Sequence, residues 1–237
     1  DMDNYVPAKP AGTVVLLRSS EQSFEVLLLK RNPKLAFAGG VWVFPGGAVD
    51  EDETRAFADE CSAAKVAARR EIFEECGLDV GEVELRHFCK WTTPREEKKR
   101  FSTWFFVAVS DQASSRILVD GSEIIDYQWI SPKSAIQKHQ EGTISFMPPT
   151  FLVLRLLSHL DSTEKAFYAL KNRAPYDVTP KMIFDSKIWM CMYPGDAGYE
   201  IGDLEISGPR HRTYYSEDGI QYVHSGDNVG FPAMDSP

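Results

Sequence analysis

Residues 70–78 read REIFEECGL, and this short stretch decides what the rest of the chain can be. In a helix, where successive side chains turn by about 100°, Glu71, Glu74 and Glu75 fall within one arc beside an apolar stripe. Like charges at this spacing repel each other, so a cation is expected to offset them. Taken alone, the same pattern is also typical of a solvated helix surface.

The residues around this stretch favour a metal site over a solvated surface. Residues 41–47 read VWVFPGG, which predicts a short strand that ends in a tight glycine turn before the helix. Hard divalent cations prefer carboxylate oxygens, water and substrate phosphates as ligands. The sequence therefore predicts a Mg2+ or Mn2+ platform on the helix.

The strand, the glycine turn and the carboxylate helix together resemble the Nudix hydrolases. Their box is written G-x5-E-x7-R-E-U-x-E-E-x-G-U, where U is an aliphatic residue. The positions that match are Gly47, Arg70, Glu71, Ile72, Glu74, Glu75, Gly77 and Leu78. The resemblance implies an α/β (α+β) fold, an α/β/α sandwich around a mixed β-sheet, and an enzyme that hydrolyses a diphosphate linkage.

The spacing within the box departs from this pattern. Gly47 and Arg70 are 23 positions apart where the box has 14, so nine residues are inserted. Counted back from Arg70, the box glutamate falls on Ser62. We expect an acid within the insertion, at position 51, 53 or 60, to pair with Arg70 instead.

The resemblance also implies which residues form the site. The glutamates of the helix would supply metal ligands and one of them the base, Arg70 would support them, and a main-chain carbonyl of the glycine turn would add an oxygen ligand. A further acid would come from a later loop. The candidate is Glu123, which can equally well be interpreted as an exposed loop residue. The metal set is then Glu71, Glu74, Glu75, Gly46, Gly47 and Glu123, and the catalytic set Glu71, Glu74, Glu75 and Arg70.

The segment before the box, residues 28–47, resembles coenzyme A diphosphatases in part. Arg31 and Gly40 match that branch, but Leu29 and Ala36 stand where it has a threonine and a second arginine. A closer likeness is to the mitochondrial and peroxisomal acyl-coenzyme A diphosphatases, whose box also carries an insertion, although Ser102 stands where an aspartate is expected. The resemblance implies coenzyme A or acyl-coenzyme A as substrate and 3',5'-ADP with (acyl-)4'-phosphopantetheine as products. ADP-ribose, NADH or a dinucleoside polyphosphate remains an alternative substrate, and a nucleotide sensor without catalysis is an alternative of another class.

Such a polyanionic substrate needs local cations in an acidic chain, which carries a formal charge of -9. Two basic stretches, residues 30–34 and 95–100, flank the box, and Lys30, Arg31 and Arg100 are the candidate substrate ligands. The second stretch also fits a solvated turn, because Glu96 and Glu97 interrupt it.

Composition limits the other functions. The acidic chain, with a pI near 5.1, gives no general attraction to nucleic acid or anionic membranes. Its apolar runs are too short to span a bilayer, and its four scattered cysteines predict neither disulfides nor zinc sites but a reducing, cytoplasmic compartment. A homodimer is expected only because related hydrolases commonly form one.

The periodicity along the chain predicts a core domain over residues 1–145 and a helical and irregular extension over residues 146–237 packed on it. Strands are expected at 12–18, 24–30, 41–44, 83–91, 100–109 and 124–130. Helices are expected from an N-cap at Ser62 to Gly77, at 133–140, at 149–160 and at 163–171, with a hairpin at 211–215 and 220–224.

Overall fold

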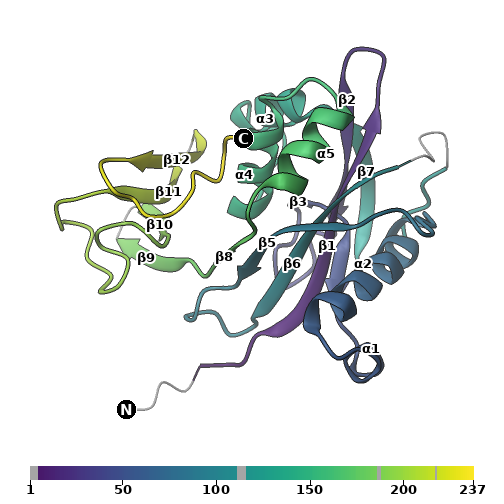
Figure 1. Cartoon of the computed structure of the whole chain (residues 1–237), viewed down its shortest axis with the longest axis horizontal. Helices are drawn as coiled ribbons and strands as arrows, with labels where there is room; N and C mark the ends of the chain where they lie inside the picture. Colours follow the sequence, from purple (N-terminus) through teal and green to yellow (C-terminus); the bar gives the residue numbers. More distant parts are fainter. Residues whose placement is uncertain (1–4, 111–115, 186–187, 217) are drawn as a thin grey trace.

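A mixed β-sheet forms the centre of the computed structural model, which describes residues 5–110, 116–185, 188–216 and 218–237 (Figure 1). Its strands run in the order β3-β2-β1-β6-β5-β8, with β4 paired to β1 and β7 paired to β2. The β1/β6 and β5/β8 pairs are parallel and the others antiparallel. The strands are β1 (Lys9–Ser19), β2 (Phe24–Arg31), β3 (Trp42–Val43), β4 (Gly46–Ala48), β5 (Arg86–Thr92), β6 (Phe101–Val109), β7 (Ile124–Ile130) and β8 (Tyr176–Val178).

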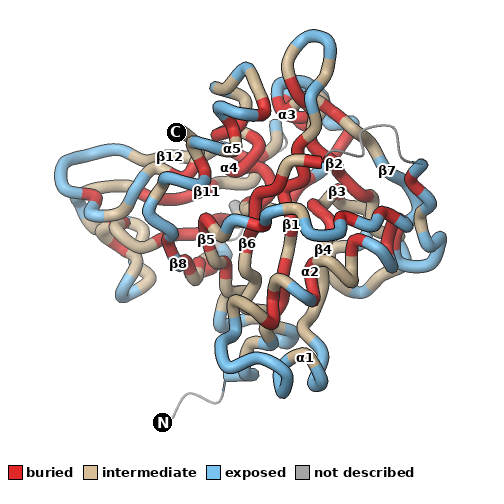
Figure 2. The backbone as a smooth tube through the Cα atoms, turned by 45° about the vertical axis from the view of Figure 1, so that its right-hand side comes forward, coloured by how far each residue is buried: buried red, intermediate tan, exposed pale blue. Residues whose placement is uncertain are grey.

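Helices cover both faces of this sheet, which gives the expected α/β/α sandwich. Helix α2 (Glu60–Cys76) packs on one face, and α3 (Pro132–Gln140), α4 (Pro148–Leu157) and α5 (Thr163–Asn172) pack on the other. Side chains alternate along β1, so Val14 and Leu16 join the α2 core while Val15 and Leu17 join the opposite core. Burial on both faces explains why β1 and β2 read as continuous apolar runs, and Figure 2 shows them as the buried centre of the molecule.

Helix α2 approaches β1 closely at Gly12. A Cβ atom at this position would overlap the main-chain carbonyl oxygen of Ala64. Glycine therefore lets the helix lie directly against the strand, which places the carboxylate-bearing end of α2 at the level of β4.

The insertion within the box folds as a helix of its own, α1 (Glu51–Ala56), which the sequence did not indicate. Asp50 and Glu53 form a capping box at its start. The expected N-cap of α2 was wrong by three residues: Asp59 is the cap, and its Oδ1 accepts a hydrogen bond from the Ser62 backbone N–H at 2.8 Å. An aspartate at this position satisfies the free backbone N–H groups of the first turn, and the helix ends at Gly77 as predicted.

The C-terminal extension carries the two expected helices and the expected hairpin, together with strands that the sequence did not indicate. Strand β8 adds to the edge of the main sheet beside β5. A second, four-stranded antiparallel sheet follows in the order β12-β11-β10-β9 and lies beyond β8 in Figure 1. Its strands are β9 (Lys181–Asp185), β10 (Ile188–Met192), β11 (Arg210–Ser216) and β12 (Gly219–Ser225). Within the described residues, the longest helices are too short or too polar to cross a lipid bilayer.

Candidate active site

Arg70 on α2 is held by Glu53 of the inserted helix. Its Nε lies 2.8 Å from Glu53 Oε1 and its Nη2 lies 3.2 Å from Glu53 Oε2, while Nη2 also donates to the Ala48 carbonyl at 2.9 Å. These hydrogen bonds raise the pKa of Arg70, so its positive charge is permanent. Glu53 is therefore the partner of Arg70 in the structure.

The other two acids considered for this role have other partners. Glu51 pairs with Arg55 on the surface of α1, and Glu60 accepts a hydrogen bond from Trp104 Nε1 at 2.7 Å. Glu53 lies six positions after Gly47, which is the G-x5-E spacing of the box counted forward from the glycine. The nine extra residues thus lie between the glutamate and the arginine. Counting forward would have selected Glu53 from the sequence.

Arg70 also contacts the first two glutamates of the predicted metal set. Its Nη1 donates to Glu71 Oε1 at 2.9 Å and to Glu74 Oε2 at 3.0 Å. One guanidinium thus offsets part of the repulsion that the sequence predicted among these carboxylates. The Glu74 side chain is 55% exposed, whereas that of Glu71 is 20% exposed.

Glu75 is the most buried carboxylate of the cluster, with only 5% of its surface exposed. Its Oε2 accepts a hydrogen bond from the Gly46 N–H at 3.0 Å. Burial raises its pKa to about 8, and repulsion from Glu71 and Glu123 adds to this rise, while the Gly46 hydrogen bond opposes it. A buried carboxylate with so little neutralising charge is a ready ligand for a cation.

The glycine turn brings the backbone against these carboxylates. A Cβ atom at Gly47 would overlap the carboxyl group of Glu71, and one at Gly46 would overlap Thr13 on β1. Only glycines leave the main chain of β4 this close to α2. The structure therefore places Gly46 and Gly47 beside Glu71 and Glu75, as a shared oxygen-ligand site would require.

Glu123 reaches the same site from the loop before β7. Its Oε1 forms an ion pair with Arg31 Nη1 at 2.8 Å. The Asp120 carboxylate shapes this loop by accepting hydrogen bonds from the backbone N–H groups of Ser122, Glu123 and Ile124. Glu123 lies near enough to Glu71 and Glu75 for its charge to raise the pKa of both.

The donor set fits a hard divalent cation. Over the described ranges, no three His, Cys, Asp or Glu side chains converge in a ready metal-binding geometry. Arg70, Arg31 and the Gly46 N–H engage the carboxylate oxygens instead. All candidate donors are nevertheless oxygens, and buried Glu75 is short of positive charge, which is the chemistry that Mg2+ and Mn2+ match.

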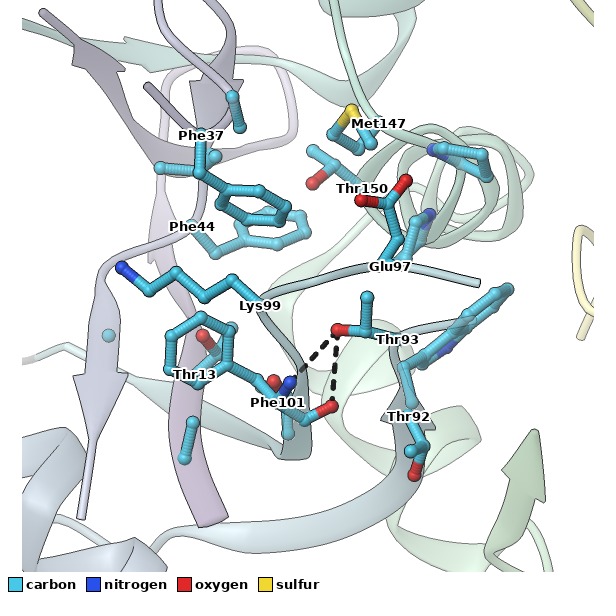
Figure 3. Close-up of a pocket in the computed structure, with 18 of the residues that line it drawn as sticks. Thr13, Phe37, Phe44, Thr92, Thr93, Glu97, Lys99, Phe101, Met147 and Thr150 are labelled. Carbon is cyan, nitrogen blue, oxygen red and sulfur yellow. Dashed lines mark hydrogen bonds between the residues drawn. The ribbon is translucent and has the colours of Figure 1, made fainter. Parts of the chain in front are cut away.

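A pocket of about 480 Å³ opens beside Glu71 and Glu123. The loop before β6 contributes Glu97 and Lys99, and the first residue of β6, Phe101, lines the pocket as well. Figure 3 shows Lys99 between the rings of Phe44 and Phe101. The Thr93 hydroxyl and the Phe101 backbone are hydrogen-bonded to each other at 3.0 Å, which fixes one end of this loop to the other.

The three predicted substrate ligands have different positions. Arg31 lines the pocket. Lys30 and Arg100 are not among the described residues that line it. The Arg100 guanidinium instead donates to the backbone carbonyls of Thr93, Pro94 and Val6, so it shapes the loop. Lys99, its neighbour, lines the pocket in its place. Side chains alternate in direction along the chain as it enters β6, so Lys99 and Phe101 share a face. This alternation is the sequence signal that could have identified Lys99 as a pocket residue.

Comparisons with known proteins agree with this site. Residues 8–148 match the NUDIX domain family. The chain is 27% identical over 263 aligned positions to "Putative nudix hydrolase 7" of Caenorhabditis elegans, covering 88% of this chain and 86% of that protein. It is also 28% identical to the "NAD-capped RNA hydrolase NudC" of Haemophilus influenzae, of which it spans only 42%.

Among solved structures, a NUDIX hydrolase from Alicyclobacillus acidocaldarius superposes with a TM-score of 0.63. At 23% identity, the match covers 70% of this chain and 98% of that one, and it supports the fold. Because the family match spans more than half of the sequence and includes the glycine turn and the carboxylate helix, the chain belongs to the NUDIX domain family and is a Nudix hydrolase.

Proposed function

We propose that this enzyme hydrolyses the diphosphate linkage of coenzyme A or an acyl-coenzyme A in a Mg2+- or Mn2+-dependent reaction. The observation that carries the proposal is the form of the pocket. Carboxylates and the glycine turn line one part of it, and the rest is lined mainly by aromatic, apolar and threonine side chains, with Glu97 and Lys99 among them. A substrate with a charged diphosphate and a long, less polar arm matches this division.

Glu71, Glu75 and Glu123, together with a main-chain carbonyl of Gly46 or Gly47, would hold the metal. Glu74, which is bound to Arg70 and more exposed, would take an outer position. A divalent cation supplies charge neutralisation of the phosphate oxygens and a lower pKa for a bound water.

The protein's own residues bind and orient the substrate. Arg31 and Lys99 lie in the pocket and would neutralise phosphate oxygens that the metal leaves free. Arg70, clamped by Glu53, fixes the carboxylates of Glu71 and Glu74. A carboxylate of the cluster accepts a proton from the attacking water.

The reaction balances with water as the only co-substrate. The water oxygen bonds to one phosphorus atom, the bridging P–O bond breaks, and the two phosphates leave as monoesters. With coenzyme A the products are 3',5'-ADP and 4'-phosphopantetheine, and an acyl group would remain on the latter.

Two alternatives remain as outcomes of the test. Another nucleotide derivative, such as ADP-ribose, NADH or a dinucleoside polyphosphate, could present the same diphosphate to the carboxylates. A sensor without catalysis would bind a nucleotide and leave it intact, and the complete set of Glu71, Glu74 and Glu75 argues against this.

The test is mass spectrometry of the products from purified protein with Mg2+ or Mn2+ and each candidate substrate in turn. Release of 3',5'-ADP from coenzyme A or acetyl-coenzyme A, lost in a folded Glu75→Gln variant, would support the proposal. Cleavage restricted to another nucleotide would overturn the substrate assignment and leave the diphosphate chemistry in place. Binding without cleavage would favour the sensor.

A further inference from the structure

The C-terminal extension forms one wall of the pocket. Strand β8 continues the main sheet by pairing Val178 with Trp91 of β5, and the chain then enters the β9/β10 hairpin. Pro180, Met182, Trp189 and Cys191 from this segment line the same pocket as Glu71 and Glu123. The family match ends at residue 148, so this wall is added by a part of the chain beyond it.

The extension wall lies far from the carboxylates. The glycine turn is on β4, which pairs with β1, and the sheet then continues through β6 to β5 and β8. Three strand spacings separate β4 from β5, which is roughly 14 Å. A group bound against the extension is therefore remote from the bond that is cleaved.

This remote end of the pocket is apolar and buried. Met182 is 9% exposed, Cys191 3% and Trp91 5%. The Cys191 thiol stays protonated, because burial raises its pKa to about 12. Glu97 lies at its border, beside Thr150 and Met147 in Figure 3. We refer to Trp91, Met147, Met182, Trp189 and Cys191 as the apolar arm.

The side chains of the apolar arm favour a chain over a planar ring. Its indole rings already pack against protein rings, Trp189 on Tyr215 with centroids 3.8 Å apart and Trp91 edge-on to Tyr193 at 5.7 Å. The two methionines are flexible and unbranched, and such side chains adapt to an aliphatic chain of variable length.

We propose that the apolar arm binds the aliphatic acyl chain of the substrate, so that the extension sets the enzyme's preference for chain length. This inference rests on the proposed function, because it requires a coenzyme A thioester with its diphosphate at Glu71 and Glu75. The flexible pantetheine arm would bridge the distance between the two ends of the pocket. Free coenzyme A and acetyl-coenzyme A would leave the apolar arm unfilled.

The test compares kcat/KM for acetyl-, octanoyl- and phenylacetyl-coenzyme A in three proteins. These are the wild type, Met182→Gln, and Phe184→Ala as a matched control on the same strand, where Phe184 is 70% exposed. The wild type should favour octanoyl- over acetyl-coenzyme A by about tenfold, because burying additional CH2 groups is favourable. Met182→Gln should lower this ratio several-fold, whereas Phe184→Ala should retain both the ratio and the wild-type kcat for acetyl-coenzyme A.

A second variant, Trp189→Ala, keeps the inference testable if Met182→Gln does not fold. It enlarges the apolar arm and should shift the preference toward longer chains, such as dodecanoyl-coenzyme A. Hydrolysis with an octanoyl-to-acetyl ratio near one in the wild type would overturn the inference and leave the proposed function intact. A preference for phenylacetyl-coenzyme A would show that the apolar arm binds an aromatic ring, and would overturn the inference that it binds an aliphatic acyl chain. If no coenzyme A derivative were cleaved, both proposals would fail.

Discussion

Replacing Glu53 by alanine tests how far the inserted helix α1 supports the site. The substitution removes both hydrogen bonds that Glu53 accepts from Arg70 and the capping-box hydrogen bond that it accepts from the Asp50 N–H, and the Glu53 side chain is only 12% exposed. Hydrogen bonds to charged groups contribute about 1.5–3 kcal/mol each when buried, and the 26% exposure of Arg70 reduces this. We expect the free energy of unfolding to fall by roughly 2–3 kcal/mol, which lowers Tm by about 4–12 °C in a chain of this size.

The activity of Glu53→Ala should fall as well, because Arg70 orients Glu71 and Glu74 only while its own position is fixed. The assay is thermal unfolding followed by differential scanning fluorimetry, with kcat/KM measured on the same preparations. Glu51→Ala is the matched control, since Glu51 lies on the same helix and its ion pair with Arg55 is exposed. The control should change stability by less than about 0.5 kcal/mol. Equal melting temperatures for the two variants would refute the structural role of the Glu53–Arg70 pair.

Three further perturbations follow from the structure. Gly47→Ala should abolish most activity and weaken Mn2+ binding measured by calorimetry, because its Cβ overlaps the Glu71 carboxyl group; wild-type affinity would contradict this. Arg212→Met should destabilise the fold by about 3–5 kcal/mol in urea titrations, since it leaves buried Asp196 without its cation, and a loss below about 1 kcal/mol would disprove it. Burial lowers the pKa of His211 to about 4, so the unfolded chain binds a proton first as the pH falls. Between pH 6.5 and 4 the wild type should therefore lose up to about 3 kcal/mol more stability than His211→Gln in urea titrations, and equal losses would contradict this.

Much of the core sandwich could be predicted because its signals are local. Three features were predicted correctly from neighbouring residues: the buried runs of β1 and β2, the helix expected at 133–140, which is α3, and the glycine that ends α2. The short strands β4 and β8 could not be read in this way, since three residues carry no periodicity and depend on pairing with β1 and β5.

The residues of the candidate site could be predicted where a sequence spacing defines them. They could not be predicted where only the fold brings them together. The helix repeat places Glu71, Glu74 and Glu75 on one arc, and the resemblance to the box identifies them as candidate site residues. The role of Arg100 in holding the Thr93 and Pro94 carbonyls depends on a loop conformation that no pattern specifies. The same is true of Met182 and Cys191, which reach the pocket only because β8 extends the sheet.

The inserted helix shows that this site tolerates a change of chain length at one particular place. Glu53 and Arg70 meet across 17 positions of sequence, yet they make the contact that the resemblance assigns to residues eight apart. Apart from Glu53, the residues of α1 are exposed at the surface, so residues can be added in this segment without moving the carboxylates. Sequence patterns that identify such enzymes should therefore allow a variable number of residues between this glutamate and the arginine. The same interval is a suitable place to insert a reporter or a binding peptide close to the candidate active site.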